Sequence, residues 1–421
     1  MVAQTPPMGW NSWDCYGASV TEQTVRANAE FMAKHLKKYG WEYIVVDIQW
    51  YEPTAESHEY HPFTELCVDE YSRVIPAENR FPSSAGGKGF APLAEYVHSL
   101  GLKFGIHIMR GIPRQAVHQN LRIKGSDKTA RQIAKTSSIC NWNTDMYGVD
   151  PAKDGAREYY NSIFELYAQW GVDFIKIDDI CRELPHEEAE LVMVSEALKG
   201  CGRDMVLSLS PGPALPEKAE LYKQTANMWR ITDDFWDKWE LLYDMFSRAQ
   251  TWCIHAAAGH FPDCDMLPIG NILQDYDKNI TTKFTQDEQI TMLTLWCIMR
   301  SPLIIGGEMT RFDDFTMSLL TNAELIEVLN STHSAHPLFR TKREGEEDIA
   351  WFTSHTDGKH YYIALFNAEG EEREISAQLP IARDMEAYDI WQGKSVGTVS
   401  GSVKAVVKPH GAVLYKLTAK D

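Results

Sequence analysis

One pattern of apolar and polar positions recurs along the first two thirds of the chain. An amphipathic segment ends at a glycine, and a short apolar run follows and then turns polar. It occurs as HLKKYG before WEYIVVD, YVHSLG before LKFGIHI, LYAQWG before VDFIKIDD, and LKGCG before RDMVLSLS. Glycine suits the left-handed turn just past a helix, and strands that alternate with helices pair in parallel. The pattern therefore predicts βαβ units.

Four further apolar runs lie at residues 8–13, 228–233, 260–267 and 303–308. Together with the four runs above they make eight strands, which predicts a (β/α)₈ barrel. The polar residues cluster where these strands end. In such a barrel the carboxyl ends of the strands form one rim, and active sites lie there.

The pattern changes near residue 335. The runs DIAWFTS, HYYIALFN, REISAQL and GAVLYKLT alternate between apolar and polar residues and are separated by turn residues, which is typical of antiparallel strands. We therefore expect a catalytic barrel over residues 1–334 and a C-terminal β-sandwich over residues 335–421. The connections 51–89 and 110–150 exceed ordinary loop lengths, which predicts excursions at the rim that wall a pocket.

The charge composition indicates which kinds of partner the protein is not expected to bind. Lys and Arg number 41 against 59 Asp and Glu, so the 421-residue chain has a formal charge of −18, which speaks against nucleic acid or an anionic membrane. The eight cysteines include no CxxC pair, and whether Cys140 and Cys181 pair stays open. Neither a leader-like N-terminus nor a charge-free run of about 20 apolar residues is seen, so we expect a soluble, cytoplasmic protein.

The first candidate group is the strand FIKIDDI. Alternation places Lys176 and Asp178 on one face, and Ile175 and Ile177 on the other. A lysine beside a carboxylate keeps the acid ionised, as a nucleophile requires. The alternative is a structural ion pair at the end of a strand, and these residues alone do not separate the two interpretations.

A second acid pair closes MWRITDD, where Asp233 and Asp234 follow Arg230. A general acid needs a raised pKa, which repulsion between neighbouring carboxylates supplies. Two strand-end acids on one rim suit glycoside hydrolysis, in which one is the acid/base and the other the nucleophile. The alternative is a solvated loop in which Asp233 caps the next helix.

A third group raises the question of a metal. His260, Asp263 and Asp265 lie in HFPDCDML, and His107 ends the strand FGIHI. These residue types bind divalent metals. Single His and Asp residues at strand ends are more often hydrogen-bonded than ligating, so we expect neither a metal nor another cofactor.

Tryptophans complete the candidate site. A pyranose presents an apolar C–H face that an indole can cover, while polar neighbours bind its hydroxyls. Among the tryptophans near predicted strand ends, we expect Trp13 and Trp50 to line the pocket. The others near strand ends are Trp10, Trp142 and Trp229.

Taken together, these blocks resemble one family. PPMGWNSW, VVDIQW, LKFGIHI, DFIKIDD, WRITDD, DCDML and SPLIIGG are similar, in order and across about residues 6–310, to the blocks of family 27 glycoside hydrolases, the melibiase-type α-galactosidases. A barrel followed by a β-sandwich is also that family's architecture. Any one block alone would be weak, but the ordered set is specific.

The resemblance implies roles for individual residues. The nucleophile falls on Asp178 and the acid/base on Asp234, in a mechanism that retains anomeric configuration, with the carboxyl groups about 5 to 5.5 Å apart. The family's sugar-binding tyrosine on the third strand falls on His107. Its remaining sugar contacts fall on Trp13, Asp47, Lys176, Arg230 and Asp265.

Besides His107 in place of a tyrosine, two positions depart from the family pattern. Where α-galactosidases have a glutamate that meets the 2-hydroxyl side of the sugar, this chain has Pro211, so that either Ser208 and Ser210 compensate or the pocket admits a larger 2-substituent such as N-acetyl. Where they have an Asp-Asp pair that binds the 4- and 6-hydroxyls, this chain has Asp47 and Ile48. A buried hydroxyl facing Ile48 would lose its partner, at a cost of about 1 to 3 kcal/mol.

This departure predicts the substrate. β-L-Arabinopyranose has the ring stereochemistry of α-D-galactose with hydrogen in place of CH₂OH, and the apolar Ile48 resembles the residue of the family's β-L-arabinopyranosidases. We expect an exo-glycosidase acting on β-L-arabinopyranosides, on α-D-galactosides, or on both. The alternatives are an α-galactosidase or α-N-acetylgalactosaminidase in which Ile48 is incidental and points at a helix, a metal-dependent barrel hydrolase, and an inactive sugar-binding protein. The expected partner is a small saccharide or a glycan terminus, and a homo-oligomer stays open.

Overall fold

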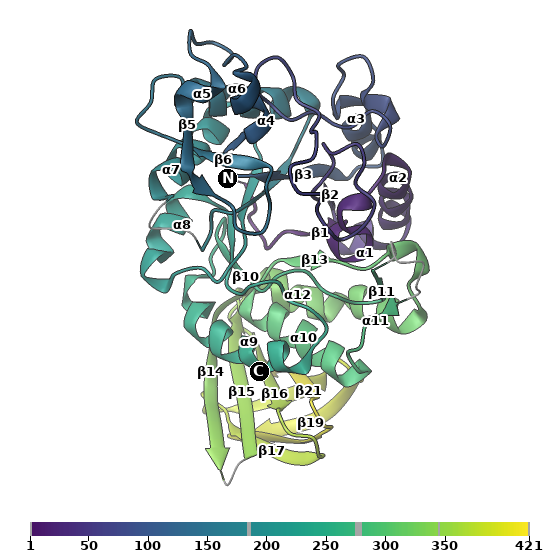
Figure 1. Ribbon diagram of the computed structural model, residues 1–421. Helices are drawn as coiled ribbons and strands as arrows, with labels where there is room; N and C mark the ends of the chain where they lie inside the picture. Colours follow the sequence, from purple (N-terminus) through teal and green to yellow (C-terminus); the bar gives the residue numbers. More distant parts are fainter. Residues whose placement is uncertain (1, 183–186, 274–279, 344–345, 420–421) are drawn as a thin grey trace.

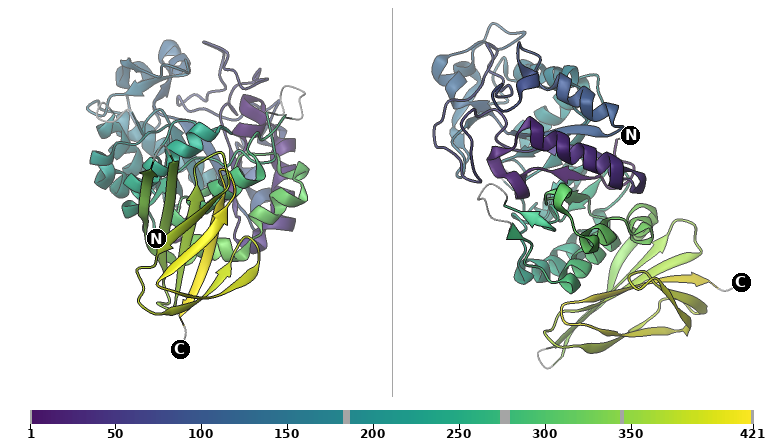
Figure 2. Two further views of the ribbon diagram at one scale, coloured as in Figure 1. Left: turned by 90° about the horizontal axis from the view of Figure 1, so that it is seen from below. Right: turned by 90° about the vertical axis from the view of Figure 1, so that its right-hand side faces the viewer.

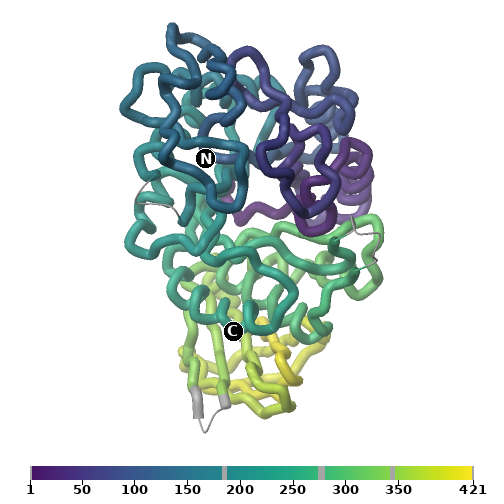
Figure 3. Tube along the Cα trace, in the orientation of Figure 1, coloured from purple at the N-terminus to yellow at the C-terminus, as the bar shows by residue number. Residues whose placement is uncertain are grey.

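The computed structural model describes residues 2–182, 187–273, 280–343 and 346–419. Its first part is a strand barrel surrounded by helices, and its last part is a layered set of antiparallel strands below that barrel (Figure 1). The chain passes from one part to the other after α12 (Ala323–Ser331), where β14 (Thr332–Arg343) begins (Figure 3). The boundary expected at residue 335 falls inside β14.

Eight parallel strands form the barrel, in the spatial order β10-β9-β8-β7-β3-β2-β1-β13. A parallel bridge between Leu267, just after β10, and Ile305 of β13 joins the two ends of this sheet. Each strand coincides with one of the eight apolar runs, so the predicted barrel is confirmed. The strands are β1 (Met8–Asn11), β2 (Tyr43–Val46), β3 (Lys103–Met109), β7 (Phe174–Asp178), β8 (Val206–Leu209), β9 (Met228–Arg230), β10 (Phe261–Asp263) and β13 (Leu303–Ile305).

The helix-ending glycines behave as the pattern predicts. α6 (Ala156–Trp170) ends at Gly171, whose φ of 80° is left-handed, and β7 begins three residues later. Gly40, with φ of 98°, has the same position before β2. Glycine adopts this conformation without the penalty that a Cβ atom would add, so each helix ends sharply and returns the chain to the barrel.

Twelve α-helices are described. Most surround the barrel, and the right-hand view of Figure 2 shows green helices, which include α10 and α12, between the barrel and the C-terminal strands. The remaining helices are α1 (Trp13–Tyr16), α2 (Glu22–Phe31), α3 (Ala91–Ser99), α4 (Arg114–Gln119), α5 (Ala130–Ile133), α7 (Glu188–Gly200), α8 (Ala219–Thr225), α9 (Trp239–Trp252), α10 (Gln286–Met299) and α11 (Asp314–Leu320).

Helix α10 joins the two parts. It packs on α9 and α12 on one side and on the C-terminal sheet on the other, so most of its residues are buried. Its apolar residues lie all round the helix, which is typical of a helix covered on every side. Thr291 Oγ1 donates to the His410 carbonyl (2.6 Å), and Trp391 Nε1 donates to Thr294 Oγ1 (2.9 Å).

The C-terminal part is the predicted antiparallel β-sandwich. One sheet has the order β14-β15-β16-β21-β18-β19, and the other pairs β17 with β20. Buried residues from both sheets, including Leu365 and Val403, share one core. The strands after β14 are β15 (Glu346–His355), β16 (His360–Asn367), β17 (Arg373–Gln378), β18 (Asp384–Asp389), β19 (Lys394–Ser400), β20 (Ser402–Val407) and β21 (Ala412–Ala419).

The two long connections lie at the barrel end of the molecule, in the upper half of Figure 1. Residues 110–150 contain a small sheet of order β4-β6-β5, formed by β4 (Ile112–Pro113), β5 (Ala134–Ile139) and β6 (Met146–Val149). A further short pair of strands joins β11 (Asn271–Ile272) to β12 (Ile280–Thr281).

All eight cysteines lie in described residues and are free, so Cys140 and Cys181 do not pair. Within the described ranges we find no helix with the length and hydrophobicity needed to traverse a bilayer.

Candidate active site

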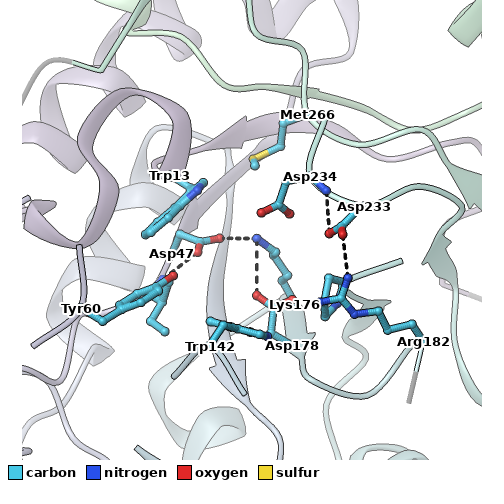
Figure 4. A pocket seen from close by; sticks show the side chains of 12 residues that line it. Trp13, Asp47, Tyr60, Trp142, Lys176, Asp178, Arg182, Asp233, Asp234 and Met266 are labelled. Atoms are coloured by element: carbon cyan, nitrogen blue, oxygen red, sulfur yellow. Dashed lines mark hydrogen bonds and ion pairs between the residues drawn. The ribbon is translucent and has the colours of Figure 1, made fainter. Parts of the chain in front are cut away.

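A pocket of about 280 Å³ opens at the carboxyl ends of the barrel strands. Its wall combines charged and aromatic side chains from strand ends with residues of both long connections (Figure 4). The two expected catalytic acids, Asp178 and Asp234, thus line the same cavity. The lining residues are Trp13, Asp47, Ile48, Tyr60, Trp142, Lys176, Asp178, Arg182, Pro211, Asp233, Asp234 and Met266.

Asp178 is the last residue of β7, and its carboxylate is held by three side chains. His107 Nε2 lies 2.7 Å from Oδ2, and the Ser210 hydroxyl donates to Oδ1. Lys176 Nζ lies 3.9 Å from Oδ2. Burial alone would raise the pKa of Asp178, but Lys176, His107 and Ser210 outweigh it and hold that pKa far below its usual range. The carboxylate is therefore ionised near neutral pH.

Strand alternation explains why Lys176 is available to the pocket. Lys176 and Asp178 point into it, whereas Ile175 and Ile177 are fully buried on the opposite face. Lys176 Nζ also lies 2.9 Å from Asp47 Oδ2, so one ammonium group bridges two carboxylates. Burial would lower the pKa of Lys176, but Asp47 and then Asp178 raise it above its usual value.

Asp47 and Ile48 follow β2, which ends at Val46, so strict alternation stops before them. Both residues line the pocket. Asn11 Nδ2 donates to Asp47 Oδ2 (2.7 Å), and the backbone N–H of Ile48 donates to Asp47 Oδ1 (2.8 Å). Burial opposes ionisation of Asp47, yet Lys176 and His107 lower its pKa below the usual value. A charged acceptor and an apolar side chain thus lie next to each other.

Asp234 has a different environment. It follows β9, and its side chain is 64% exposed. Arg230 Nη2 donates to Asp234 Oδ1 (2.9 Å). The backbone N–H of Asp234 donates to Asp233 Oδ1 (3.0 Å), and Arg182 Nη1 donates to Asp233 Oδ2 (2.7 Å). This acid is oriented but open to solvent.

Arg230 and Asp265 lie behind Asp234. Arg230 Nη1 lies 2.7 Å from Asp265 Oδ1, and Asp265 also accepts the backbone N–H groups of Phe235 (2.8 Å) and Met266 (2.7 Å). Burial would lower the pKa of Arg230, but the charges of Asp265 and Asp234 raise it above its usual value. Burial also raises the pKa of Asp265, although the charge of Arg230 acts to lower it. Both residues are almost fully buried, and neither is among the residues that line the pocket.

Three further predicted sugar-binding residues are, like Arg230 and Asp265, absent from the pocket lining. His107 and Ser210 are buried behind Asp178 and bond that carboxylate instead of lining the cavity. Trp50, expected in the pocket, lies in the core. Its ring packs 5.0 Å from that of Phe90, and its Nε1 donates to the His107 carbonyl (2.7 Å). That buried carbonyl satisfies the indole N–H, so Trp50 packs fully inside the protein.

Among the described residues, those considered as metal ligands do not bring three ligand atoms together. His107 bonds Asp178, whereas His260 Nδ1 lies 3.3 Å from the Ala226 carbonyl. Asp263 Oδ1 accepts the Asp265 N–H (2.9 Å). Each of these polar groups has another partner.

Several lining residues were missed as site residues. Tyr60 and Trp142 come from the two long connections, so the expectation that these connections wall a pocket is confirmed, although only their length signalled it. Arg182 follows β7 by four residues and Met266 follows Asp265 directly. Nearness to a predicted acid could have singled out the last two.

Two family models match the chain. Residues 151–331 match the model described as alpha galactosidase A, and residues 346–417 match the alpha galactosidase C-terminal beta sandwich domain. Among curated relatives, an α-galactosidase of Coffea arabica is 28% identical over 98% of this chain and 94% of its own length.

Solved structures are more similar. A GH27 β-L-arabinopyranosidase from Geobacillus stearothermophilus is 53% identical, with a TM-score of 0.95 and coverage of 99% of this chain and 97% of that one. Its variant in complex with arabinose is 52% identical, with a TM-score of 0.96 and coverage of 100% and 98%. A candidate α-N-acetylgalactosaminidase from Bacillus halodurans C-125 is 50% identical, with a TM-score of 0.89 over the whole of both chains. Since more than half of the residues are identical over nearly the full length of the first of these structures, the chain belongs to glycoside hydrolase family 27 and is a glycoside hydrolase.

Proposed function

We propose that this enzyme is a retaining exo-glycosidase that prefers terminal β-L-arabinopyranosides and hydrolyses α-D-galactosides more slowly. The observation that carries the preference is the position of Ile48, which lines the pocket directly beside Asp47. The similarity to the G. stearothermophilus β-L-arabinopyranosidase supports the same substrate.

The roles of the two acids follow from their surroundings. Asp178 has a pKa far below its usual range, so it is a poor proton donor and a constantly ionised nucleophile. The side chain of Asp234 is 64% exposed, so both a glycosidic oxygen and the attacking water can reach it, as the acid/base role requires. We therefore assign Asp178 as the nucleophile and Asp234 as the acid/base.

The reaction then has two displacements. In the first, an Asp178 oxygen attacks the anomeric carbon while Asp234 gives its proton to the glycosidic oxygen, and the aglycone leaves as an alcohol. In the second, Asp234 takes a proton from water, whose oxygen attacks the same carbon and releases Asp178. Two inversions at one carbon retain the anomeric configuration.

The charged groups near Asp178 favour these two displacements. Lys176 lies between Asp47 and Asp178, so it holds both carboxylates charged while Asp47 accepts hydrogen bonds from sugar hydroxyls. His107 and Ser210 fix the Asp178 oxygens, which reduces the reorganisation required when the carboxylate attacks. His107 and Ser210 thus position the nucleophile.

Ile48 accounts for the preference between the two sugars. The exocyclic hydroxyl of a galactoside would find no polar side chain at Ile48, whereas an arabinopyranoside has no such group. Discrimination of this kind amounts to about 10- to 200-fold in kcat/KM.

A second candidate is an α-N-acetylgalactosaminidase. Pro211 lines the pocket where α-galactosidases have a glutamate, and it offers no side-chain acceptor for a 2-hydroxyl. The B. halodurans structure, 50% identical, supports considering this activity.

Three p-nitrophenyl glycosides distinguish these functions: β-L-arabinopyranoside, α-D-galactopyranoside and α-N-acetylgalactosaminide. We expect the first to have the highest kcat/KM, and an NMR time course to show release of the retained anomer. A tenfold or larger preference for either other substrate would contradict the inference from Ile48. Release of the inverted anomer would contradict the two-step mechanism.

A further inference from the structure

Tyr60 brings an aromatic ring to the pocket from outside the barrel strands. It lies in the connection 51–89, and its ring stacks on Trp13 with centroids 5.6 Å apart and planes 16° apart. The Trp142 ring, from the second connection, lies 5.7 Å from Tyr60. Figure 4 shows Trp13 and Tyr60 on one side of the pocket, opposite Arg182 and Asp233. The two connections thus add a wall that the barrel alone does not supply.

Contacts on both sides of Tyr60 hold this segment in place. His58 Nε2 lies 3.0 Å from the Trp13 carbonyl, and the Ala18 N–H donates to the Ser57 carbonyl (2.9 Å). Gly17 permits this approach, because a Cβ there would lie 2.7 Å from His58 Cγ. On the other side, the Phe63 N–H donates to Thr144 Oγ1 (2.7 Å). Tyr60 is therefore positioned before substrate binds.

The phenol end of Tyr60 points into the pocket toward Asp47 (Figure 4). Within the described part of the chain, its hydroxyl makes no hydrogen bond. Burial raises the pKa of Tyr60 well above its usual value, and the charges of Asp47, Asp178 and Asp234 raise it further. The phenol therefore keeps its proton and remains a donor.

A sugar in this pocket needs such a donor. A hydroxyl that donates to the Asp47 carboxylate keeps two lone pairs, and a carboxylate cannot satisfy them. Lys176 is the cation beside Asp47, and its ammonium group is shared between Asp47 and Asp178. A neutral O–H group near Asp47 supplies the remaining hydrogen bond without changing the charge of the site.

We propose that Tyr60 is a further substrate-binding residue, whose hydroxyl donates to the sugar hydroxyl that Asp47 accepts from. The inference rests on the proposed glycosidase function and adds one contact on the Asp47 side of the sugar. The connection 51–89 thereby takes part in recognising the sugar as well as enclosing it.

Tyr60→Phe is the direct test, because it removes the hydroxyl and keeps the ring that stacks on Trp13. We expect kcat/KM for p-nitrophenyl β-L-arabinopyranoside to fall about tenfold, the loss typical of one neutral hydrogen bond. Tyr361→Phe, which removes a phenol hydroxyl from β16 of the sandwich, is the matched control and should leave kcat/KM unchanged. An unchanged kcat/KM for Tyr60→Phe would overturn the inference.

Monodeoxy substrates separate hydrogen bonding from structural support. For p-nitrophenyl arabinopyranosides lacking one hydroxyl each, the loss caused by Tyr60→Phe should disappear for the one whose missing hydroxyl binds Tyr60. An equal loss across the series would indicate a structural role and would also overturn the inference.

The wild-type enzyme distinguishes this inference from the function on which it rests. If the wild type hydrolyses the arabinopyranoside and Tyr60→Phe is indistinguishable from it, only the role of Tyr60 is wrong. If the wild type hydrolyses none of the three glycosides, the proposed function itself fails.

Discussion

The ends of β7 and β9 each bring a carboxylate to the same pocket, but in opposite surroundings. The side chain of Asp178, the last residue of β7, is 12% exposed and bonds His107 and Ser210. The side chain of Asp234 after β9 is 64% exposed and is held by Arg230 alone among side chains of the described residues. A buried acid with several donors keeps its negative charge, whereas an exposed acid exchanges its proton freely. The difference between the two environments is what assigns the two roles.

Replacing the buried acid should have the largest effect. Asp178→Asn removes the nucleophile, so we expect kcat to fall about 10⁴-fold or more for every substrate, whatever the leaving group. Steady-state rates with p-nitrophenyl and alkyl β-L-arabinopyranosides would measure this. Near-normal turnover of the p-nitrophenyl substrate would contradict the assignment of Asp178.

Replacing the exposed acid should have an effect that depends on the aglycone. Asp234→Asn removes the proton donor, so we expect a loss of about 10²- to 10⁴-fold with alkyl glycosides. The loss in the first displacement should be much smaller with a good leaving group such as dinitrophenolate, since that group leaves without protonation. A comparison of pre-steady-state bursts for the two aglycones checks this, and the reverse dependence would exchange the two roles.

Replacing Ile48 tests whether its apolar side chain sets the preference between arabinopyranosides and galactosides. Ile48→Asp should restore an acceptor for the exocyclic hydroxyl and shift the ratio of kcat/KM for galactoside over arabinopyranoside upward by about 10- to 200-fold. Ile48→Val is the matched control, because it keeps the position apolar and should leave the ratio close to that of the wild type. A ratio that moves equally in both variants would show that pocket shape, and not polarity, sets the preference.

The smallest effect should come from weakening the donors around Asp178. Ser210→Ala removes a bond to the charged form, so the pKa of Asp178 rises and the acid limb of the kcat/KM profile moves to higher pH. Activity near neutral pH should fall only a few-fold, about the cost of one hydrogen bond.

Ser208→Ala is the control for this variant, because it removes a hydroxyl from β8, the strand that Ser210 follows. Among the described residues, the Ser208 hydroxyl makes no hydrogen bond to Asp178. Its acid limb should match that of the wild type. A shift to lower pH in Ser210→Ala would contradict the proposed role of Ser210.

Much of the site was predictable because it depends on local pattern. The alternation in FIKIDDI places Lys176 and Asp178 on one face, and the carboxyl ends of parallel strands meet at one rim. These two rules bring Asp47, Asp178 and Asp234 to one pocket, as the structure shows. The family resemblance added residue roles, which variants can now test.

Residues beyond the strand ends were harder to place. Trp50 and Trp13 have similar positions relative to a strand, yet Trp50 packs beside Phe90 in the core and Trp13 lines the pocket. His107 aligns with a sugar-binding residue of the family, and its bond to Asp178 was not predicted. Which neighbour a side chain meets depends on segments 40 or more residues away along the chain, and strand periodicity holds no information about them.

By itself, the sequence determined the barrel, the sandwich and the rim on which the acids gather, because hydrophobic periodicity and glycine-ended helices act over a few residues. Only the tertiary structure decided that Tyr60 and Trp142 close the pocket, that His107 and Ser210 hold the nucleophile, and that the two acids differ in exposure. These outcomes depend on how distant segments pack against one another, and burial and charge at each site exist only after that packing is complete.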